Sequence, residues 1–425
     1  MGTLRNLIAI GVPSWFRRLG PGLITGAADD DPGGIATHSQ VGAAFGFDLL
    51  WTILLTLPLM SAIQSICARI GRVTGEGLAA NMTRVLPRPV VGGVVCLLIV
   101  ANVVNIGADL AAMGAAAELV IGWGGTVFAV LFAAISLFLQ VFIPYHRYVH
   151  VLKWLTLSLL AYVGVVFSVT IDWDAVIAGI VHPRIAASRE MLIAVVAVFG
   201  TTISPYLFFW QSAEEVEEEQ LAGEGPLLDQ PDKAEAELSR IAWDTIVGMG
   251  FSSLISFFIV LTTAVTLHQA GISDIATSAD AARALRPIAG DFAFFLFSLG
   301  IIGTGLLALP VLAGSAAYAV GELRGWRIGL EQKPENAKAF YGVIAACFAT
   351  GLLMLFLPID PIRALFWSAV LNGVIAVPLM VATMLVVSSR AHLGPFVAPL
   401  ALRMIGWAAT GVMGLAVVGM MVLSV

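Results

Sequence analysis

Three consecutive aspartates, Asp29, Asp30 and Asp31, interrupt the first long apolar stretch of the chain and are followed by Pro32 and two glycines. Carboxylate oxygens are preferred ligands of hard cations such as Mg²⁺, Ca²⁺ and Mn²⁺. Proline removes a backbone donor and glycine relaxes the chain, so a helix with this sequence is interrupted and some carbonyls lose their helical partners. Within a bilayer, such groups are tolerated where they line a cavity or meet a ligand. The sequence therefore predicts a cation site around Asp31; the alternative is that the aspartates lie in water at a helix end.

A second interruption has the sequence Gly200-Thr201-Thr202-Ile203-Ser204-Pro205 and separates two apolar runs of the sixth hydrophobic segment. Taken alone, it has a simple proline kink as the alternative interpretation. Segments one and six are five apart, however, and paired interruptions at corresponding places in two halves are typical of transporters built from inverted repeats, with the substrate site near the bilayer midplane.

Three further polar residues lie in apolar segments and have two interpretations each. His38, about two helical turns after Asp31, is either a hydrogen-bonded packing residue or a functional one that accepts a proton or bonds to an ion-bound water. Asp109 in the third segment either joins a polar network or transfers protons. Asn372 in the tenth segment either forms an interhelical hydrogen bond or supplies an oxygen to a hydrated ion.

The composition predicts that helices spanning a membrane position these residues. The chain has 425 residues, of which 59% are hydrophobic and 12% charged, and its mean hydropathy is +0.94; soluble domains carry about 25% charged residues. We expect an all-α membrane protein with eleven transmembrane helices, each long enough for a hydrocarbon core of about 30 Å. The expected spans are 22–46, 48–68, 90–120, 124–143, 151–171, 191–212, 242–268, 291–320, 339–357, 363–388 and 404–424.

These spans predict one transmembrane domain over residues 1–425, with repeats at about 20–171 and 190–388 and an extra helix at about 404–424. Most of the 22 Lys and Arg residues fall in one set of connections. This bias predicts a cytoplasmic N-terminus and an external C-terminus. The expected location is a bacterial inner membrane. The glutamate run at 214–219 is expected to be a solvated helix end, with a cation-attracting vestibule as the alternative.

Several function classes have no support in the sequence. There is no phosphate-binding loop, no Ser-His-Asp spacing and no cluster of Cys and His ligands, so we do not expect an enzyme or a cofactor. No basic patch suggests nucleic acid as a partner. The sequence does not indicate an oligomeric state.

The residues around the first interruption resemble the Nramp family of divalent metal transporters. The matching residues are Gly20-Pro21-Gly22, Asp31-Pro32-Gly33, Ile35-Ala36-Thr37, Gln40, Gly42-Ala43 and Leu49-Leu50-Trp51. The resemblance implies a five-plus-five inverted repeat, the LeuT-like fold, with helices 1 and 6 broken. It also implies a metal site built from an Asp and an Asn on helix 1 and from a Met and a backbone carbonyl on helix 6.

This chain departs from the family pattern at four positions. Gly34 stands at the Asn position and Ser204 at the Met position. Gln211 stands at the position of a histidine that is linked to proton movement in the family. Asp109 is followed three residues later by Ala112, where the family often has Glu. A thioether favours transition metals over hard ions, so its loss weakens discrimination against Mg²⁺. The pattern is most similar to the Nramp-related magnesium transporter branch, which implies little or no proton coupling.

The prediction is therefore an alternating-access transporter of Mg²⁺ and Mn²⁺, with the ion partly hydrated because Gly34 and Ser204 leave room for water. Membrane lipid is its other expected partner. The alternatives are a proton-coupled Mn²⁺ or Fe²⁺ importer, a trivalent-ion transporter, and an amino-acid or organic-solute transporter on the same scaffold. The expected metal-binding residues are Asp31, Ala28, Gly34, Thr201, Ser204 and Asp30. The residues expected to bind ion-bound water or to move protons are Asp29, His38, Asp109, Gln211 and Asn372.

Overall fold

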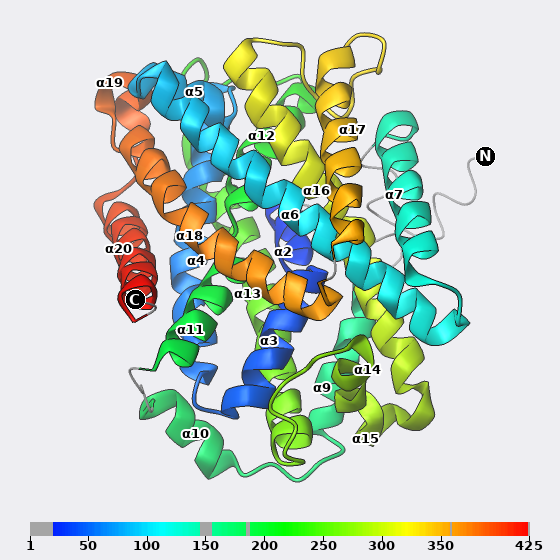
Figure 1. Ribbon diagram of the computed structural model, residues 1–425. Helices are drawn as coiled ribbons and strands as arrows, with labels where there is room; N and C mark the ends of the chain where they lie inside the picture. Colours follow the sequence, from blue (N-terminus) through cyan, green and yellow to red (C-terminus); the bar gives the residue numbers. More distant parts are fainter. Residues whose placement is uncertain (1–19, 145–154, 184–187, 358, 424–425) are drawn as a thin grey trace, which may run out of the picture.

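The computed structural model describes residues 20–144, 155–183, 188–357 and 359–423, and within these ranges the regular structure is entirely helical. The long helices form one bundle that runs between two ends of the molecule (Figure 1). Nine helical segments of the described chain are long and apolar enough to cross a membrane: α4 (Leu50–Thr74), α6 (Arg88–Ile121), α7 (Gly125–Phe142), α11 with α12 (Arg189–Ala222), η3 to η4 (Pro231–His268, containing α13, Ala234–Thr263), α16 (Ala293–Arg324), α17 with η7 (Lys338–Phe356), α18 (Pro361–Val387) and α20 (Leu400–Val422).

Two of the predicted spans are described differently. The first consists of two short helices, α2 (Pro21–Asp29) and α3 (Pro32–Phe45). For the fifth, the structure describes η2 (Leu155–Leu159) and α9 (Leu160–Val166), while residues 145–154 of the predicted span and its approach lie outside the described ranges. The protein is a multi-pass membrane protein, and the count of eleven crossings stays a prediction.

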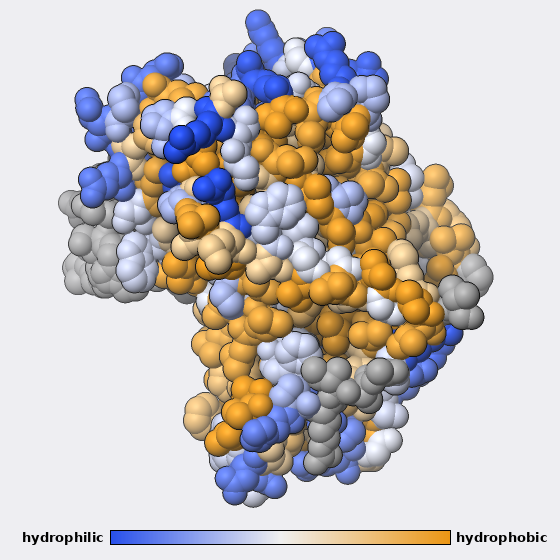
Figure 2. Space-filling view, turned by 90° about the vertical axis from the view of Figure 1, so that its left-hand side faces the viewer, coloured by the Kyte–Doolittle hydropathy of each residue, from blue (hydrophilic) through white to orange (hydrophobic). Residues whose placement is uncertain are grey.

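Short helices mark the two ends of the bundle. One end carries α5 (Leu78–Val85) and α19 (Arg390–Leu393), and the other carries α10 (Trp173–Val181), α14 (Ser278–Ala282) and α15 (Arg286–Ala289) (Figure 1). We call these the α5 end and the α10 end. Figure 2 shows hydrophobic residues across the middle of one face and hydrophilic residues mainly at the two ends, as expected of a protein surrounded by lipid.

Helix α13 fixes the position of α2. The first backbone N–H groups of a helix have no helical partner, and here the carboxylate of Asp244 on α13 accepts from Gly20 N (3.0 Å), Gly22 N (2.7 Å) and Leu23 N (3.3 Å). Further along, Gly26 of α2 packs directly on the backbone of Gly248, where a Cβ on either residue would clash with the other helix. The first half of the broken span is therefore held against α13 at its start and along its length.

The other half-helices are held by similar close packing of small residues. A Cβ on Gly42 of α3 would clash with Thr263 on α13. A Cβ on Gly200 of α11 would clash with Ala369 and Gly373 on α18. Both interrupted spans are thus fixed on unbroken neighbours, which leaves their interruptions in the middle of the bundle.

Candidate metal site

The first interruption is a helix end followed directly by a helix start. Helix α2 ends at Asp29, and Asp31 adopts an extended conformation (φ −69°, ψ 172°) as the N-cap of α3. Its Oδ1 accepts a hydrogen bond from Gly34 N at 2.6 Å, and Pro32 occupies the first helical position, where a missing N–H costs nothing. The positive end of α3 therefore faces the Asp31 carboxylate.

The second interruption repeats this arrangement. Helix α11 (Arg189–Thr202) ends before Ile203, Ser204 is the extended N-cap (φ −75°, ψ 130°), and Pro205 begins α12 (Pro205–Ala222). Ser204 does not cap α12 with its side chain. Its hydroxyl lies 2.8 Å from the carbonyl oxygen of Thr201 and 2.9 Å from that of Gly200, so its one hydrogen is directed at these two acceptors.

The two prolines free equivalent carbonyls. In a helix, a carbonyl accepts from the N–H four residues later, and proline has none. Pro32 therefore frees the carbonyl of Ala28, and Pro205 frees that of Thr201, which are the two carbonyls expected at the site. In the structure each is met by a hydroxyl: Ser204 reaches Thr201, and the Tyr206 hydroxyl lies 3.4 Å from the Ala28 oxygen.

The two interruptions face each other across Gly34. A Cβ placed on Gly34 would lie 3.2 Å from the Asp29 carbonyl oxygen and 3.5 Å from both Asp31 Oδ1 and Thr201 Oγ1. Tyr206 also joins the two breaks, since its hydroxyl donates to Asp31 Oδ2 at 3.1 Å. The structure thus brings together Ala28, Asp31, Gly34 and Thr201 at one place, with Ser204 bonded to Thr201.

The two other aspartates point to a different helix. Ser252 of α13 lies 2.6 Å from Asp29 Oδ2 and 3.1 Å from Asp30 Oδ1, while Asp29 Oδ1 is buried without a hydrogen-bond partner in the described chain. All three carboxyl groups are almost fully buried, each 3–4% exposed. Ionised groups are costly to bury without a counter-charge, so a cation at this place would be strongly favoured.

The remaining predicted residues lie in different surroundings. His38 Nδ1 is 2.7 Å from the Gly34 oxygen and its Nε2 is buried without a partner among the described residues. The Oδ2 atom of Asp109 is also buried and unpartnered there, and Asp109 is close enough to Asp31 for their charges to interact. Asn372 accepts from Asn105 Nδ2 at 2.9 Å, which is the interhelical hydrogen bond considered as one of its two interpretations.

Gln211 belongs to a polar chain on the α5 side of the interruptions. Its Oε1 accepts a short hydrogen bond from Thr25 of α2, and its Nε2 donates to Glu215 at 3.2 Å. Glu215 is paired with Arg240 of α13 at 2.8 Å. The chain therefore links α2, α12 and α13 between Asp31 and the α5 end.

A second ionic group lies beside this chain. Arg72 of α4 is 2% exposed and forms ion pairs with Glu219 (3.2 Å), Glu224 (2.7 Å) and Glu237 (3.4 Å). Lys233, which donates to Glu224 at 3.0 Å, is the main cause of a lowered pKa of this surface carboxyl. The expectation that the glutamate run is a solvated helix end is wrong for Glu215 and Glu219, because both are buried and paired with arginines contributed by other helices.

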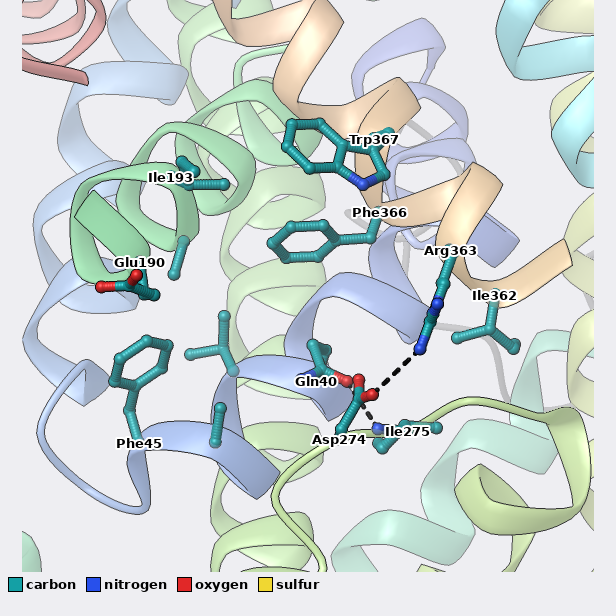
Figure 3. Close-up of a pocket in the computed structure, with 13 residues that line it drawn as sticks. Gln40, Phe45, Glu190, Ile193, Asp274, Ile275, Ile362, Arg363, Phe366 and Trp367 are labelled. Carbon is teal, nitrogen blue, oxygen red and sulfur yellow. Dashed lines mark hydrogen bonds and ion pairs between the residues drawn. The ribbon is translucent and has the colours of Figure 1, made fainter. Parts of the chain in front are cut away.

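On the opposite side, a cavity of about 460 Å³ opens at the α10 end between α3, α11 and α18 (Figure 3). Gln40 and Val41 of α3 line it, roughly 14 Å beyond Asp31 at 1.5 Å per helical residue. At its edge, Arg363 pairs with Asp274 at 3.2 Å, and Gln40 accepts from Ile275 N at 2.8 Å. The cavity lies on this side of the interruptions, and Asp31 is not part of its lining.

Two residues at the interruptions were missed by the sequence reasoning. Tyr206 follows Pro205 directly, so a polar aromatic residue beside a predicted break was the available signal. Ser252 contacts the aspartates from α13, and nothing in its local sequence distinguishes it from the other hydroxyl residues of that helix. In the described ranges, no group of three or more His, Cys, Asp and Glu side chains is arranged to hold a metal. A cation at the interruptions would therefore need backbone, hydroxyl or water oxygens as well.

The sequence matches the Nramp family (Natural resistance-associated macrophage protein-like) over residues 22–423. The chain belongs to the Nramp family. Curated relatives include two proteins named divalent metal cation transporter MntH. The one from Yersinia pestis (strain Pestoides F) is 28% identical over 308 residues, 70% of this chain and 71% of the relative. The one from Verminephrobacter eiseniae is 28% identical over 371 residues, 82% of this chain and 80% of the relative.

Solved structures agree on the fold of this Nramp chain. It is similar to the Eremococcus coleocola manganese transporter, crystallised with an aromatic bis-isothiourea substituted compound, with a TM-score of 0.75 and 17% identity over 98% of this chain and 89% of that one. Mhp1, a nucleobase-cation-symport-1 family transporter in a closed conformation, matches with a TM-score of 0.53 and 13% identity over 96% of this chain and 92% of that one. The fold is therefore that of a LeuT-like membrane transporter. The members of the Nramp family move metal ions as substrates, which confirms the expectation that the protein is not an enzyme.

Proposed function

We propose that this protein transports divalent cations by alternating access, with the ion held between the two helix interruptions. The observation that carries this proposal is the meeting of the two helix interruptions at the buried Asp31 carboxylate. The Tyr206 hydroxyl lies within 3.4 Å of both Asp31 Oδ2 and the Ala28 carbonyl oxygen, and the Thr201 hydroxyl of the second interruption lies beside Gly34. Oxygens of these kinds are the ligands that hard divalent cations use. The names of the curated relatives, which are divalent metal cation transporters, support the same substrate class.

The chemistry of the site favours Mg²⁺ and Mn²⁺ as substrates. Ser204 stands at the position where the family has a methionine, so this position offers a hydroxyl and no sulfur. The hydroxyl bonds to carbonyl oxygens of the preceding helix. Gly34 has no side chain at all, and the space beside it is lined by oxygens of both interruptions. Mg²⁺ releases water reluctantly and retains several waters in most sites, so an oxygen-lined gap suits a partly hydrated ion. Asp29 and Asp30 supply further acceptors for such water.

Weak or absent proton coupling is part of the proposal. A coupled importer needs groups that change protonation near neutral pH, and Gln211 does not titrate. The second candidate, a proton-coupled importer of Mn²⁺ or Fe²⁺, is favoured by Asp109 Oδ2 and His38 Nε2, which are buried and have no hydrogen-bond partner among the described residues. A pH-sensitive dye inside liposomes separates the two, because metal uptake without acidification contradicts coupling.

The direction of access follows from the charge bias of the connections. With the N-terminus in the cytoplasm, as proposed for a bacterial inner membrane, the α5 end is cytoplasmic and the cavity at the α10 end opens outside. The polar chain from Thr25 to Arg240 then closes the inner side. In this arrangement an external ion reaches the interruptions along α3, and the inner chain must separate before release.

The test is metal flux into proteoliposomes. Asp31→Ala is expected to abolish uptake of both Mg²⁺ and Mn²⁺, while Tyr341→Phe, which removes a hydroxyl near the α5 end, is expected to leave it unchanged. Uptake at the wild-type level in the Asp31 variant would refute the proposal. Competition by millimolar Mg²⁺ against Mn²⁺ uptake tests the substrate range, and indifference to Mg²⁺ would indicate a transition-metal transporter.

A further inference from the structure

We propose that the Tyr206 hydroxyl is an internal substitute for the transported ion: it occupies the gap between Asp31 and Ala28 when no ion is bound, and it leaves when the ion arrives. This inference rests on the proposed function, because it assigns a role at the same site. Tyr206 is fully buried at the start of α12. Its hydroxyl oxygen lies 3.1 Å from Asp31 Oδ2 and 3.4 Å from the Ala28 carbonyl oxygen.

Both acceptors of Tyr206 are oxygens that a cation would use. The carboxylate belongs to the N-cap of α3, and the carbonyl is the one freed by Pro32. A hydroxyl has one hydrogen, so it cannot donate fully to both at the same time. A cation between the same two oxygens would interact with both at once. The tyrosine is therefore a partial substitute that an ion can replace.

The charges around the hydroxyl support this role. The carboxyl groups of Asp31, Asp29 and Asp109 all interact electrostatically with Tyr206. Its O–H hydrogen is thus a partial positive charge directed at Asp31 Oδ2, at 3.1 Å, in surroundings that hold two further acidic groups. Without this donor, an ion-free site would leave Asp31 with backbone N–H donors at the start of α3, among them Gly34 N at 2.6 Å. The tyrosine therefore stabilises the empty site and competes with the ion.

The competition predicts an unusual effect of Tyr206→Phe. Removal of a hydroxyl from a metal-binding site normally weakens metal binding, because an oxygen that contacts the ion, directly or through a bound water, is lost. Here the ion no longer has to break the hydrogen bond to Asp31, and the empty site loses a stabilising contact. Apparent affinity for Mn²⁺ and Mg²⁺ is therefore expected to rise by about tenfold, the equivalent of one hydrogen bond to a charged group.

The experiment is calorimetric titration of the purified full-length protein with MnCl₂ and MgCl₂ at mildly alkaline pH, where protons compete little. Three variants are compared with the wild type: Tyr206→Phe, the control Tyr341→Phe, and Asp31→Ala. Tyr341 is a suitable control because its hydroxyl also lies near two carbonyl oxygens, at 2.8 and 3.3 Å, but outside the site. Tighter binding in the Tyr206 variant alone is the expected result. Unchanged or weaker binding in a folded Tyr206 variant overturns the inference.

The two proposals fail in different ways. If Asp31→Ala still binds and transports like the wild type, the proposed function itself is refuted. If Asp31→Ala is inactive but Tyr206→Phe binds more weakly, the site stands and Tyr206 is a ligand or a holder of water. A second measurement keeps the test valid if the variant does not fold: wild-type protein labelled with fluorotyrosine at its six tyrosines is titrated with MgCl₂ and followed by ¹⁹F NMR. One buried resonance is expected to shift, and the absence of any shift overturns the inference.

Discussion

Substitution of Gly34 tests whether the ion keeps part of its water. An added Cβ would lie 3.2 Å from the Asp29 carbonyl oxygen, which is tighter than an ordinary contact, and 3.5 Å from Asp31 Oδ1 and Thr201 Oγ1. Gly34→Ala therefore fits after a small shift but fills space between the interruptions. Gly34→Asn fills more of that space and adds a carbonyl oxygen that can replace a water in the ion's shell.

The expected magnitudes follow from packing and hydration. Extra methyl groups in a filled interior cost about 1–3 kcal/mol, and about 1.4 kcal/mol corresponds to a tenfold change in rate. We therefore expect Gly34→Ala to lower Mg²⁺ uptake by about tenfold. Mg²⁺ releases water less readily than Mn²⁺ and binds nitrogen and oxygen ligands less tightly. Gly34→Asn is therefore expected to raise the ratio of Mn²⁺ to Mg²⁺ uptake by about tenfold.

The assay is initial uptake of each ion into proteoliposomes at equal protein content. Gly93→Ala on α6 is the matched control, because a Cβ at that position meets no atom within 4 Å. If the ratio of Mn²⁺ to Mg²⁺ uptake is unchanged or lower in the Gly34→Asn variant, the glycine does not serve to leave room for ion-bound water. Equal losses in the Gly93 control would show that the effect is not local to the site.

Two further predictions concern the ends of the pathway. Arg72→Ala leaves the buried Glu219 without its counter-charge. Loss of one partner of a buried pair lowers the free energy of unfolding by about 3–5 kcal/mol, so we expect a clearly lower melting temperature in detergent. Arg84→Ala removes an exposed ion pair and is expected to change melting little, so equal shifts would refute the buried network as a stabilising contact. Arg363→Ala removes a positive charge from the mouth of the cavity. At low salt and low metal concentration, metal uptake from that side is expected to rise by about two- to threefold. At high salt, uptake is expected to return toward the wild-type rate, because salt screens the charge. A rise in uptake that does not depend on ionic strength would mean that the ion pair between Arg363 and Asp274 affects uptake by fixing the segment around Asp274, and not through the charge of Arg363.

The sequence by itself determined where the two helices break. Proline lacks an N–H and an extended polar residue precedes it in both cases, so Asp31-Pro32 and Ser204-Pro205 specify a helix start from local chemistry alone. The same rule identifies Ala28 and Thr201 as the freed carbonyls. Hydropathy determined the membrane class, because runs of about 20 apolar residues cannot be mistaken for surface helices of a soluble protein.

Only the tertiary structure decided which polar groups meet these breaks. The first break is reached by Ser252 from α13 and by Tyr206 from α12, both far away in the chain, and no periodicity in the sequence indicates either contact. The glutamate run shows the physical reason most clearly. A charged residue is stable in a buried place when another helix brings a counter-charge, and Glu219 and Glu215 are buried because Arg72 and Arg240 approach them from α4 and α13.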